Sequence, residues 1–529
     1  MSDITLQGVS STSLPGVYVQ LNFAQGQSGL PTQVYSALVL ANCTSQGSQA
    51  SCTAGTVFGP STLVPLQTVN DAINLFGAGS PAHLMYAAFK AKNQNTPLFV
   101  APVAAATGTA ATQVITITTS GTQTTGVVQY SVDGKTPAQA VFGASDTVTT
   151  IAANLAAAIN GNINLPVTAT SSSGVVTVTA KVVGARGNNL RGFAQIVSGS
   201  GPSVSINSPA YFTSGAGSDA AGYTATLNGI AGNGQRYYYY VSEAGADFID
   251  GYTNQIPEEI QAQIDNLAQP ANGLRQRAVF GSNDTVAHTA NVATSLNDPR
   301  LEIVQCSQLD LTAGELAATW AADIMVFETV PLAATGVNFD GFGSDAGSQP
   351  YWNVRAPLNG SAPSTTDLQT CIVSGVTPLR VGPGGTTSVV KRVTTRFYSL
   401  GGAGGSQQVL DLRITDAGKV TICDRFFDDL SGLITQRYPR MLIGNDPQNG
   451  APPAGPGVVT PGKMTNTCLE VIQTYAAAGL INGTATISGL VVQRNTSNSS
   501  SIGIIVPLFV ADPLHQTLIL GNQLPSILV

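Results

Sequence analysis

Residues 371–397 read CIVSGVTPLRVGPGGTTSVVKRVTTRF, and this stretch decides how the chain is organised. It begins as the end of a helix and closes in a concentration of positive charge. Val376 and Leu379 precede a glycine-rich turn at residues 382–385, and Val389 follows the turn. Apolar and β-branched residues on both sides of a glycine turn predict a β-hairpin. Nothing in the stretch has the pattern of a nucleophile, a metal site or a phosphate-binding loop.

Charged residues make up only 10% of the 529 residues, whereas an average soluble protein has roughly 25%. Glycine is frequent, with 57 residues. Few charges and many small residues suit a surface that copies of the same chain cover, and they equally suit a β-rich protein with many loops. The net charge of −7 argues against a nucleic-acid partner, because no basic stripe is present to neutralise phosphates.

The N-terminus, MSDITLQG, has neither the basic nor the apolar region of a secretion signal. The most apolar segment, residues 502–510, is far shorter than the roughly 20 residues that span a bilayer. We therefore expect a soluble protein that is not inserted in a membrane and that folds in a bacterial cytoplasm.

The six cysteines are dispersed and form no CxxC pair, which argues against a zinc site. Cys43 and Cys52 bracket a polar loop and could close it as a disulfide. The reducing cytosol opposes such a bond, so both states stay open at this point.

Alternating patterns predict an α/β and α+β multidomain chain. Residues 34–103 and 213–330 alternate strands with amphipathic helices, which suggests one parallel sheet with crossover helices. Between them, residues 104–212 are rich in Ala, Thr and Val and read as an inserted β-rich domain, with one helix whose apolar face holds Ile151, Leu155 and Ile159. The expected units are an N-terminal arm (1–33), the α/β middle domain (34–103 plus 213–370), the inserted outer domain (104–212), a C-terminal α+β domain (371–511) and a C-terminal arm (512–529); the resemblance described below implies that residues 371–511 are the polymerisation domain that faces a tube.

Short local signals fix several helix ends. Ser80 followed by Pro81 predicts a helix start, and Thr312 with Glu315 forms a capping box. Gly77 is expected to end the short helix that precedes Ser80.

Two patterns resemble ligand sites but lack a physical requirement. Residues 457–463 match G-x-x-x-x-G-K, but Met464 stands where a magnesium-binding hydroxyl should be and the preceding loop is proline-rich. The loop containing Asn338, Asp340 and Asp345 lacks the closing bidentate Glu of a calcium site. No G-x-S-x-G elbow occurs. We therefore predict no catalytic, cofactor-binding or metal site, and no enzyme activity.

Five segments, in this order, resemble the contractile tail sheath proteins of bacteriophages, and the insertion resembles that of the Mu-like group. They are residues 15–19 (PGVYV), 70–80, 147–160, 375–395 and 424–480. The resemblance implies a structural virion subunit that polymerises as stacked hexameric rings around a tail tube. Contraction of the sheath would drive the tube through the host envelope and deliver the genome. The implied partners are further copies of the chain, the tail tube protein, and the baseplate and tail terminator proteins.

The resemblance also implies roles for three sets of residues. Strands that link subunits are expected at Val17, Tyr18, Val19, Ile504, Ile505 and Val506. A tube-facing helix is expected to present Lys463, Thr467, Glu470 and Gln473. The charge-dense region from residue 391 to residue 440 reads either as an intramolecular or solvated face, or as a contact between subunits that involves Lys391, Arg392, Arg396, Asp424, Arg425, Asp428 and Asp429.

Two other classes of protein remain as alternatives. A different β-rich virion or surface protein, such as an adhesin, would need an export signal if it acted on the cell surface. An α/β enzyme would need convergent polar residues, which the sequence does not offer. A phage tail, a tailocin and a secretion system are not separated by the sequence, although the Mu-like insertion favours a phage.

Overall fold

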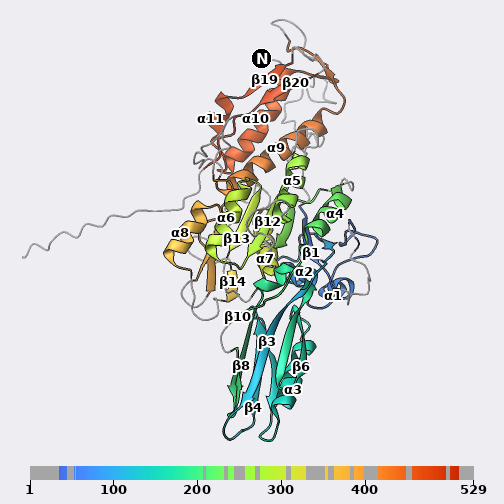
Figure 1. The fold of residues 1–529 in the computed structure, drawn as a ribbon. Coiled ribbons are helices and arrows are strands. Elements are labelled where there is room, and N and C mark those ends of the chain that lie inside the picture. Colours follow the sequence, from blue (N-terminus) through green and yellow to red (C-terminus); the bar gives the residue numbers. More distant parts are fainter. Residues whose placement is uncertain are drawn as a thin grey trace, which may run out of the picture. The chain divides into compact units, whose positions relative to one another are not determined.

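The computed structural model describes residues 35–44, 53, 55–105, 107–206, 210–231, 236–243, 256–268, 275–305, 311–328, 352–355, 363–381, 386–397, 415–447, 455–495 and 501–511. These residues belong to two compact units, one within Tyr35–Asp424 and one within Arg425–Phe509. The architecture is mixed, with helices and several separate sheets, as the alternating sequence patterns predict (Figure 1).

An eight-stranded sheet forms the centre of the first unit, in the strand order β14-β16-β15-β13-β12-β11-β1-β2. The six strands from β15 to β2 pair in parallel. This confirms the parallel sheet that the sequence predicts across the insertion. The strands are β1 (Ala37–Asn42), β2 (Leu98–Val103), β11 (Tyr239–Glu243), β12 (Arg277–Ser282), β13 (Leu301–Gln305), β14 (Trp352–Arg355), β15 (Thr377–Val381) and β16 (Thr386–Val389).

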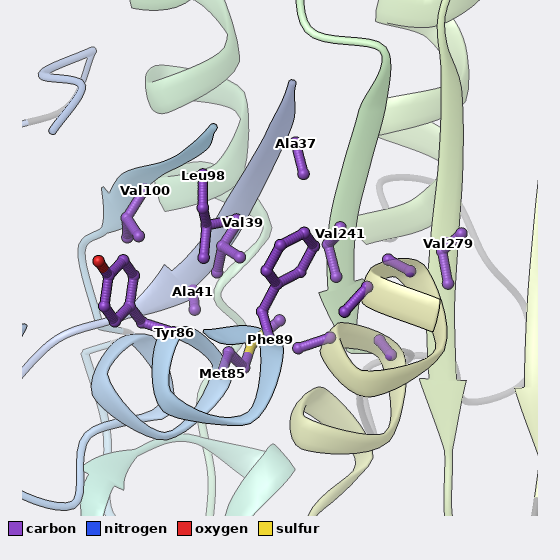
Figure 2. Packing of buried hydrophobic residues seen from close by; sticks show 14 of the residues in the cluster. Ala37, Val39, Ala41, Met85, Tyr86, Phe89, Leu98, Val100, Val241 and Val279 are labelled. Carbon is purple, nitrogen blue, oxygen red and sulfur yellow. The ribbon is translucent and has the colours of Figure 1, made fainter. Parts of the chain in front are cut away.

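Helices pack on both faces of this sheet, and each face has its own apolar core. One core contains residues of α1 (Val69–Phe76), α2 (Pro81–Lys92) and α7 (Ala313–Glu328). Figure 2 shows Met85 and Phe89 of α2 among the side chains of β1, β2 and β11. The other core contains residues of α4 (Ala220–Ala231), α5 (Ile256–Ala268), α6 (Val286–Leu296) and α8 (Thr365–Val373). Parallel strands that are buried on both faces explain why their sequences are continuously apolar.

The predicted helix ends are present. The Ser80 hydroxyl accepts a hydrogen bond from the backbone N–H of His83, with Pro81 at the first helical position. Thr312 and Glu315 cap each other at the start of α7, with the Thr312 N–H 3.0 Å from the Glu315 carboxylate. Gly77 follows α1 with a φ of 88°, which favours glycine.

The strands β15 and β16, which flank the glycine-rich turn at residues 382–385, form the predicted hairpin. β15 and β16 are antiparallel, with Leu379 opposite Val389. Both side chains are buried in the core beneath α2 and α7. β15 also pairs in parallel with β13, so the hairpin extends the central sheet instead of beginning a new domain. The division between the compact units accordingly falls at Asp424, within α9 (Ala417–Arg437), and not at residue 371 as the sequence analysis expects.

The insertion forms two four-stranded antiparallel sheets with one helix, α3 (Val148–Gly161). Ile151, Leu155 and Ile159 of α3 are fully buried in the core that these sheets share, as their spacing predicts. One sheet has the order β10-β8-β4-β5 and the other β6-β7-β3-β9. Their strands are β3 (Ala110–Thr119), β4 (Gly126–Val132), β5 (Ala138–Phe142), β6 (Val167–Ser172), β7 (Val175–Val183), β8 (Arg191–Ser198), β9 (Pro202–Val204) and β10 (Ala210–Tyr211).

The chain enters and leaves the insertion at adjacent points. The Thr109 N–H donates to the Ala216 carbonyl at 3.0 Å, and the Ala216 N–H donates back to the Thr109 carbonyl at 3.1 Å. Side chains also join the insertion to the α/β part of the unit. Lys135 pairs with Glu315, Arg186 pairs with Asp219 and Glu243, and Lys181 Nζ lies 2.8 Å from the Ala78 carbonyl.

The second unit contains the later part of α9, α10 (Pro461–Ala477) and α11 (Gly483–Ser488). It also holds the short parallel pair β17 (Leu442–Ile443) and β18 (Val458–Val459), and the antiparallel pair β19 (Val491–Arg494) and β20 (Ile502–Ile505). Helix α10 buries Met464, Cys468, Val471, Ile472 and Tyr475. Thr460 caps it and Pro461 is its first residue, so residues 457–463 form an ordinary helix start.

Candidate assembly interface

The β19–β20 hairpin is the element in the second unit best suited to pair with another chain. Ile504 and Ile505 lie in β20, opposite Val492 and Val491 of β19. The paired residues Val491 and Ile505 are 42% and 61% exposed. In the described part of the chain no third strand joins this two-stranded sheet. A two-stranded sheet can be extended at its edges, and an isolated hairpin gains stability from added strands.

The other residues of the predicted linking strands are less informative. Val506 follows β20 directly and is partly buried. Val17, Tyr18 and Val19, together with the C-terminal arm at residues 512–529, lie outside the described residues, so their role stays a prediction.

Arg392 lies in a fully buried cluster of charges within its own subunit. Its guanidinium donates to both carboxylate oxygens of Glu302, at 2.8 and 2.7 Å, and to the Tyr239 hydroxyl at 3.0 Å. All three side chains are inaccessible to solvent. The structure thus provides the intramolecular partner that the sequence analysis left open for Arg392. A surface contact between subunits is incompatible with this burial unless the cluster opens.

Arg277 extends this cluster to the first turn of α9. Its guanidinium donates to Tyr239 at 3.0 Å and to the Ala417 carbonyl at 2.9 Å, and it also contacts Thr421. Burial alone would raise the pKa of Glu302, but Arg392 and Arg277 hold this pKa below its ordinary value. The sequence analysis missed Arg277, Glu302 and Tyr239. The available signal was a charged residue at the first or second position of an otherwise apolar strand, in RAVF and LEIV.

Three of the other six predicted charge-contact residues also have partners in the same unit. Lys391 pairs with Asp416 at 3.1 Å, and Asp424 accepts two hydrogen bonds from Arg300 at 2.6 and 2.9 Å. Asp429 accepts a hydrogen bond from the Tyr475 hydroxyl at 2.6 Å.

Three charged residues of the predicted set remain. Arg425 and Asp428 are buried in the same stretch of α9 as Asp429. Arg396 is partly buried, and its side chain makes no ion pair with the described residues. Among the seven residues, Arg396 is therefore the best candidate for a contact with another chain.

Helix α10 packs against the later part of α9 in an antiparallel pair. Phe426 stacks edge-on against Tyr475 with ring centroids 5.2 Å apart, while Tyr438 at the other end lies 2.8 Å from the Thr467 hydroxyl. Between them Arg437 pairs with Glu470 at 2.6 Å. This packing determines which residues of α10 are accessible.

The four predicted tube-facing residues of α10 do not form one exposed set. Thr467 is buried at 1% exposure beneath Tyr438, because it lies on the same face as Val471. Lys463 donates to the Val458 and Gly455 carbonyls, and Glu470 is held by Arg437. Gln473 is exposed. Leu469 and Ala476 of the same helix are only partly buried.

Cys43 is buried and disulfide-bonded in the structure. Cys52, its expected partner, lies outside the described residues, so the pairing stays a prediction. In the parts of the chain that the structure describes, no three His, Cys, Asp or Glu side chains are grouped as a metal site requires. The same parts contain no helix that is long and apolar enough to cross a membrane.

No protein-family model matches the chain. Over 511 residues, which are 94% of this chain and 94% of the relative, the chain is 22% identical to the tail sheath protein of the Mu-like prophage FluMu from Haemophilus influenzae. Both chains are covered almost from end to end, including the insertion and the second unit.

The chain is thus similar to a tail sheath protein over nearly its whole length.

This similarity confirms the resemblance that the sequence motifs indicate. In the second unit, the β19–β20 hairpin and the α9–α10 pair are the elements to consider for contacts with another chain.

Proposed function

We propose that this chain is the subunit of a contractile phage tail sheath, that it polymerises as stacked hexameric rings around the inner tail tube, and that contraction of the sheath drives the tube through the host envelope. The observation that carries the proposal is the similarity to a tail sheath protein over 94% of both chains. Similarity of this extent includes every unit of the fold. Similarity confined to a single domain would not support a common mode of assembly.

The structure of the hairpin supports a mechanism for linking subunits. The terminal arms, with Val17, Tyr18 and Val19 in the first, would add strands to the exposed edges of β19 and β20 in a neighbour. Backbone hydrogen bonds of added strands do not depend on which side-chain surfaces are in contact. The links would thus persist while the packing between rings changes on contraction.

The charged residues would divide between the two alternatives that the sequence leaves open. Arg392, Glu302 and Arg277 would serve to hold α9 on the α/β sheet, whereas Arg396 would contact a neighbouring subunit. On α10, Gln473 is the residue that would face the tail tube, with Lys463 at the start of the same helix. The baseplate and tail terminator proteins would bind the two ends of the polymer.

Electron microscopy of the purified protein in negative stain tests the proposal. Hollow cylinders built from the chain alone are the expected result, and discrete monomers at all protein concentrations and salt conditions would contradict it. Deleting residues 1–20 or residues 512–529 should leave a folded monomer that forms no cylinders. If one truncated chain still forms full-length cylinders, that arm does not link subunits.

A pair of matched substitutions tests the charge assignment. Arg396→Glu should change the length or the proportion of cylinders while thermal unfolding of the monomer stays near that of the wild type. Arg392→Glu should instead unfold the monomer, because a second carboxylate would lie beside buried Glu302. The opposite pattern would argue that Arg392 and not Arg396 lies between subunits.

A further inference from the structure

The outside of the insertion is almost free of charge. Residues 104–212 contain only six charged side chains: Asp133, Lys135, Asp146, Lys181, Arg186 and Arg191. Lys135, Lys181 and Arg186 contact the α/β part of the unit, as described above. Asp133 and Arg191 are buried together at the same end, and Asp146 accepts a hydrogen bond from the Gly143 N–H in a turn. The exposed sheet faces therefore present neutral groups.

One of these faces carries a row of amides. In the sheet β10-β8-β4-β5, core residues alternate with outward residues, and the outward positions include one glutamine on each of three adjacent strands. Gln129 of β4 lies opposite Gln139 of β5 on one side and opposite Gln195 of β8 on the other. The Gln139 amide donates to the Gln129 oxygen at 3.1 Å. Because neighbouring strands are about 4.8 Å apart, the three amides span roughly 10 Å.

Aromatic rings lie beside this row. Phe193 is the next outward residue of β8 after Gln195, and it is only partly buried. Tyr211 of β10 is 47% exposed and pairs with Arg191, whose guanidinium lies 5.5 Å from the centre of the Tyr211 ring. Arg191 itself is 6% exposed, so the ring and not the charge faces outward.

We propose that this face, which we define by Gln129, Gln139, Gln195, Phe193 and Tyr211 and call the amide face, binds a neutral polysaccharide. A primary amide offers a donor and an acceptor side by side, and this combination complements the adjacent hydroxyls of a sugar ring. An aromatic ring packs against the C–H groups of the same sugar. The lack of exposed charge fits an uncharged polymer and gives no attraction to an anionic one.

A second protein is a poorer match for the amide face. Stable protein interfaces cover about 800 Å² on each partner and have a packed apolar centre. Apart from the rings of Tyr211 and Phe193, the exposed apolar side chains on this face are Val141 and Val197, with partly buried Val127 between their strands. Three valines at one end do not provide such a centre. Weak binding of a repeating polymer by many copies of the face requires no such area.

The experiment is electrophoresis of the full-length protein through native gels that contain dextran, yeast mannan or galactan as neutral probes, with alginate as the anionic comparison. At least one neutral probe should retard the protein, and alginate should not. Replacing Gln129 and Gln195 together by Ala should reduce the affinity at least tenfold, and Gln139→Ala should reduce it less.

The matched control replaces Thr118 and Thr170 by Ala. Both are exposed on the other sheet, β6-β7-β3-β9, and their removal should leave retardation unchanged. Thermal unfolding of each variant establishes that it is folded. The proposal is overturned if none of the three neutral probes retards the wild type, or if the threonine control loses as much affinity as the glutamine variant. The assay does not require the protein to assemble. A failure to bind the polysaccharides is therefore distinct from a failure to form cylinders.

Discussion

Replacing Glu302 by Gln tests whether the buried charge cluster stabilises the first unit. The substitution keeps the shape of the side chain but turns one carboxylate oxygen into an amide that donates hydrogen bonds. That amide would point at a guanidinium, since Glu302 contacts Arg392 through both oxygens and lies 3.5 Å from Arg277. Two donors would then face each other without solvent, because all three side chains are 0% exposed.

The expected loss of unfolding free energy is large. Removing one partner of a buried ion pair costs about 3–5 kcal/mol, because the remaining charge is left in a poorly solvating environment. Domains are stable by only about 5–15 kcal/mol, so this single change removes a substantial fraction of the total. For a unit of this size we expect a decrease of roughly 5–15 °C in the temperature of unfolding.

The assay is thermal unfolding of unassembled protein, followed by circular dichroism, with Arg437→Gln as the control. Arg437 also belongs to an ion pair, with Glu470, but those side chains are 30% and 35% exposed. Exposed pairs contribute only about 0–1 kcal/mol, so the control should unfold within a few degrees of the wild type. If Glu302→Gln is no more destabilised than Arg437→Gln, the reasoning from burial is wrong.

Two further predictions concern the insertion and its attachment. Leu155→Ala should destabilise the insertion by about 2–5 kcal/mol, since Leu155 is fully buried between the two sheets, and exchange of amide hydrogens should rise in residues 107–206 but not in the central strands. Equal exchange in both regions would mean that the insertion and the α/β part unfold together. Burial lowers the pKa of His83 to about 4, with Glu315 raising it and Lys135 and Lys181 lowering it further. His83 therefore binds a proton more readily in the unfolded chain than in the folded chain. The stability that neutral His83 contributes is present above about pH 6.5 and is lost as the pH falls toward 4. His83→Asn can still accept the hydrogen bond from the Gly79 N–H. Thermal scans should therefore show that this variant loses less stability than the wild type between pH 6.5 and 4. An equal loss of stability in both proteins would refute this role of His83.

Much of the first unit could be predicted because its signals are local. Helix α2 begins with the hydrogen bond from the His83 N–H to the Ser80 hydroxyl and with Pro81 at its first position, all within four residues. The hairpin around residues 382–385 follows from the β-branched residues on both sides of a turn. The buried face of α3 follows from the spacing of Ile151, Leu155 and Ile159. Each of these depends only on residues that are close in the sequence.

The rest depends on contacts between distant residues. Arg392 meets Glu302 across 90 positions and Arg277 meets Ala417 across 140, so the sequence identified a charge-dense region but not its partners. The same cause explains α10, where Tyr438 and the packing of α9 bury Thr467, although the residue is polar. A helical pattern gives the spacing of a face, but the neighbouring helix decides which face is covered.

The paired hydrogen bonds between Thr109 and Ala216 mean that the two ends of the insertion occupy almost one point on the surface of the unit. A module with adjacent ends can be removed or exchanged with little change to the remainder of a fold. Replacing the segment between these residues by a short turn should preserve the eight-stranded sheet, provided that Glu315, Asp219 and Glu243 are neutralised with it. The same position would accept a foreign domain with adjacent termini, so each subunit of a polymer could display a chosen binding module while the units that build the polymer keep their own sequence.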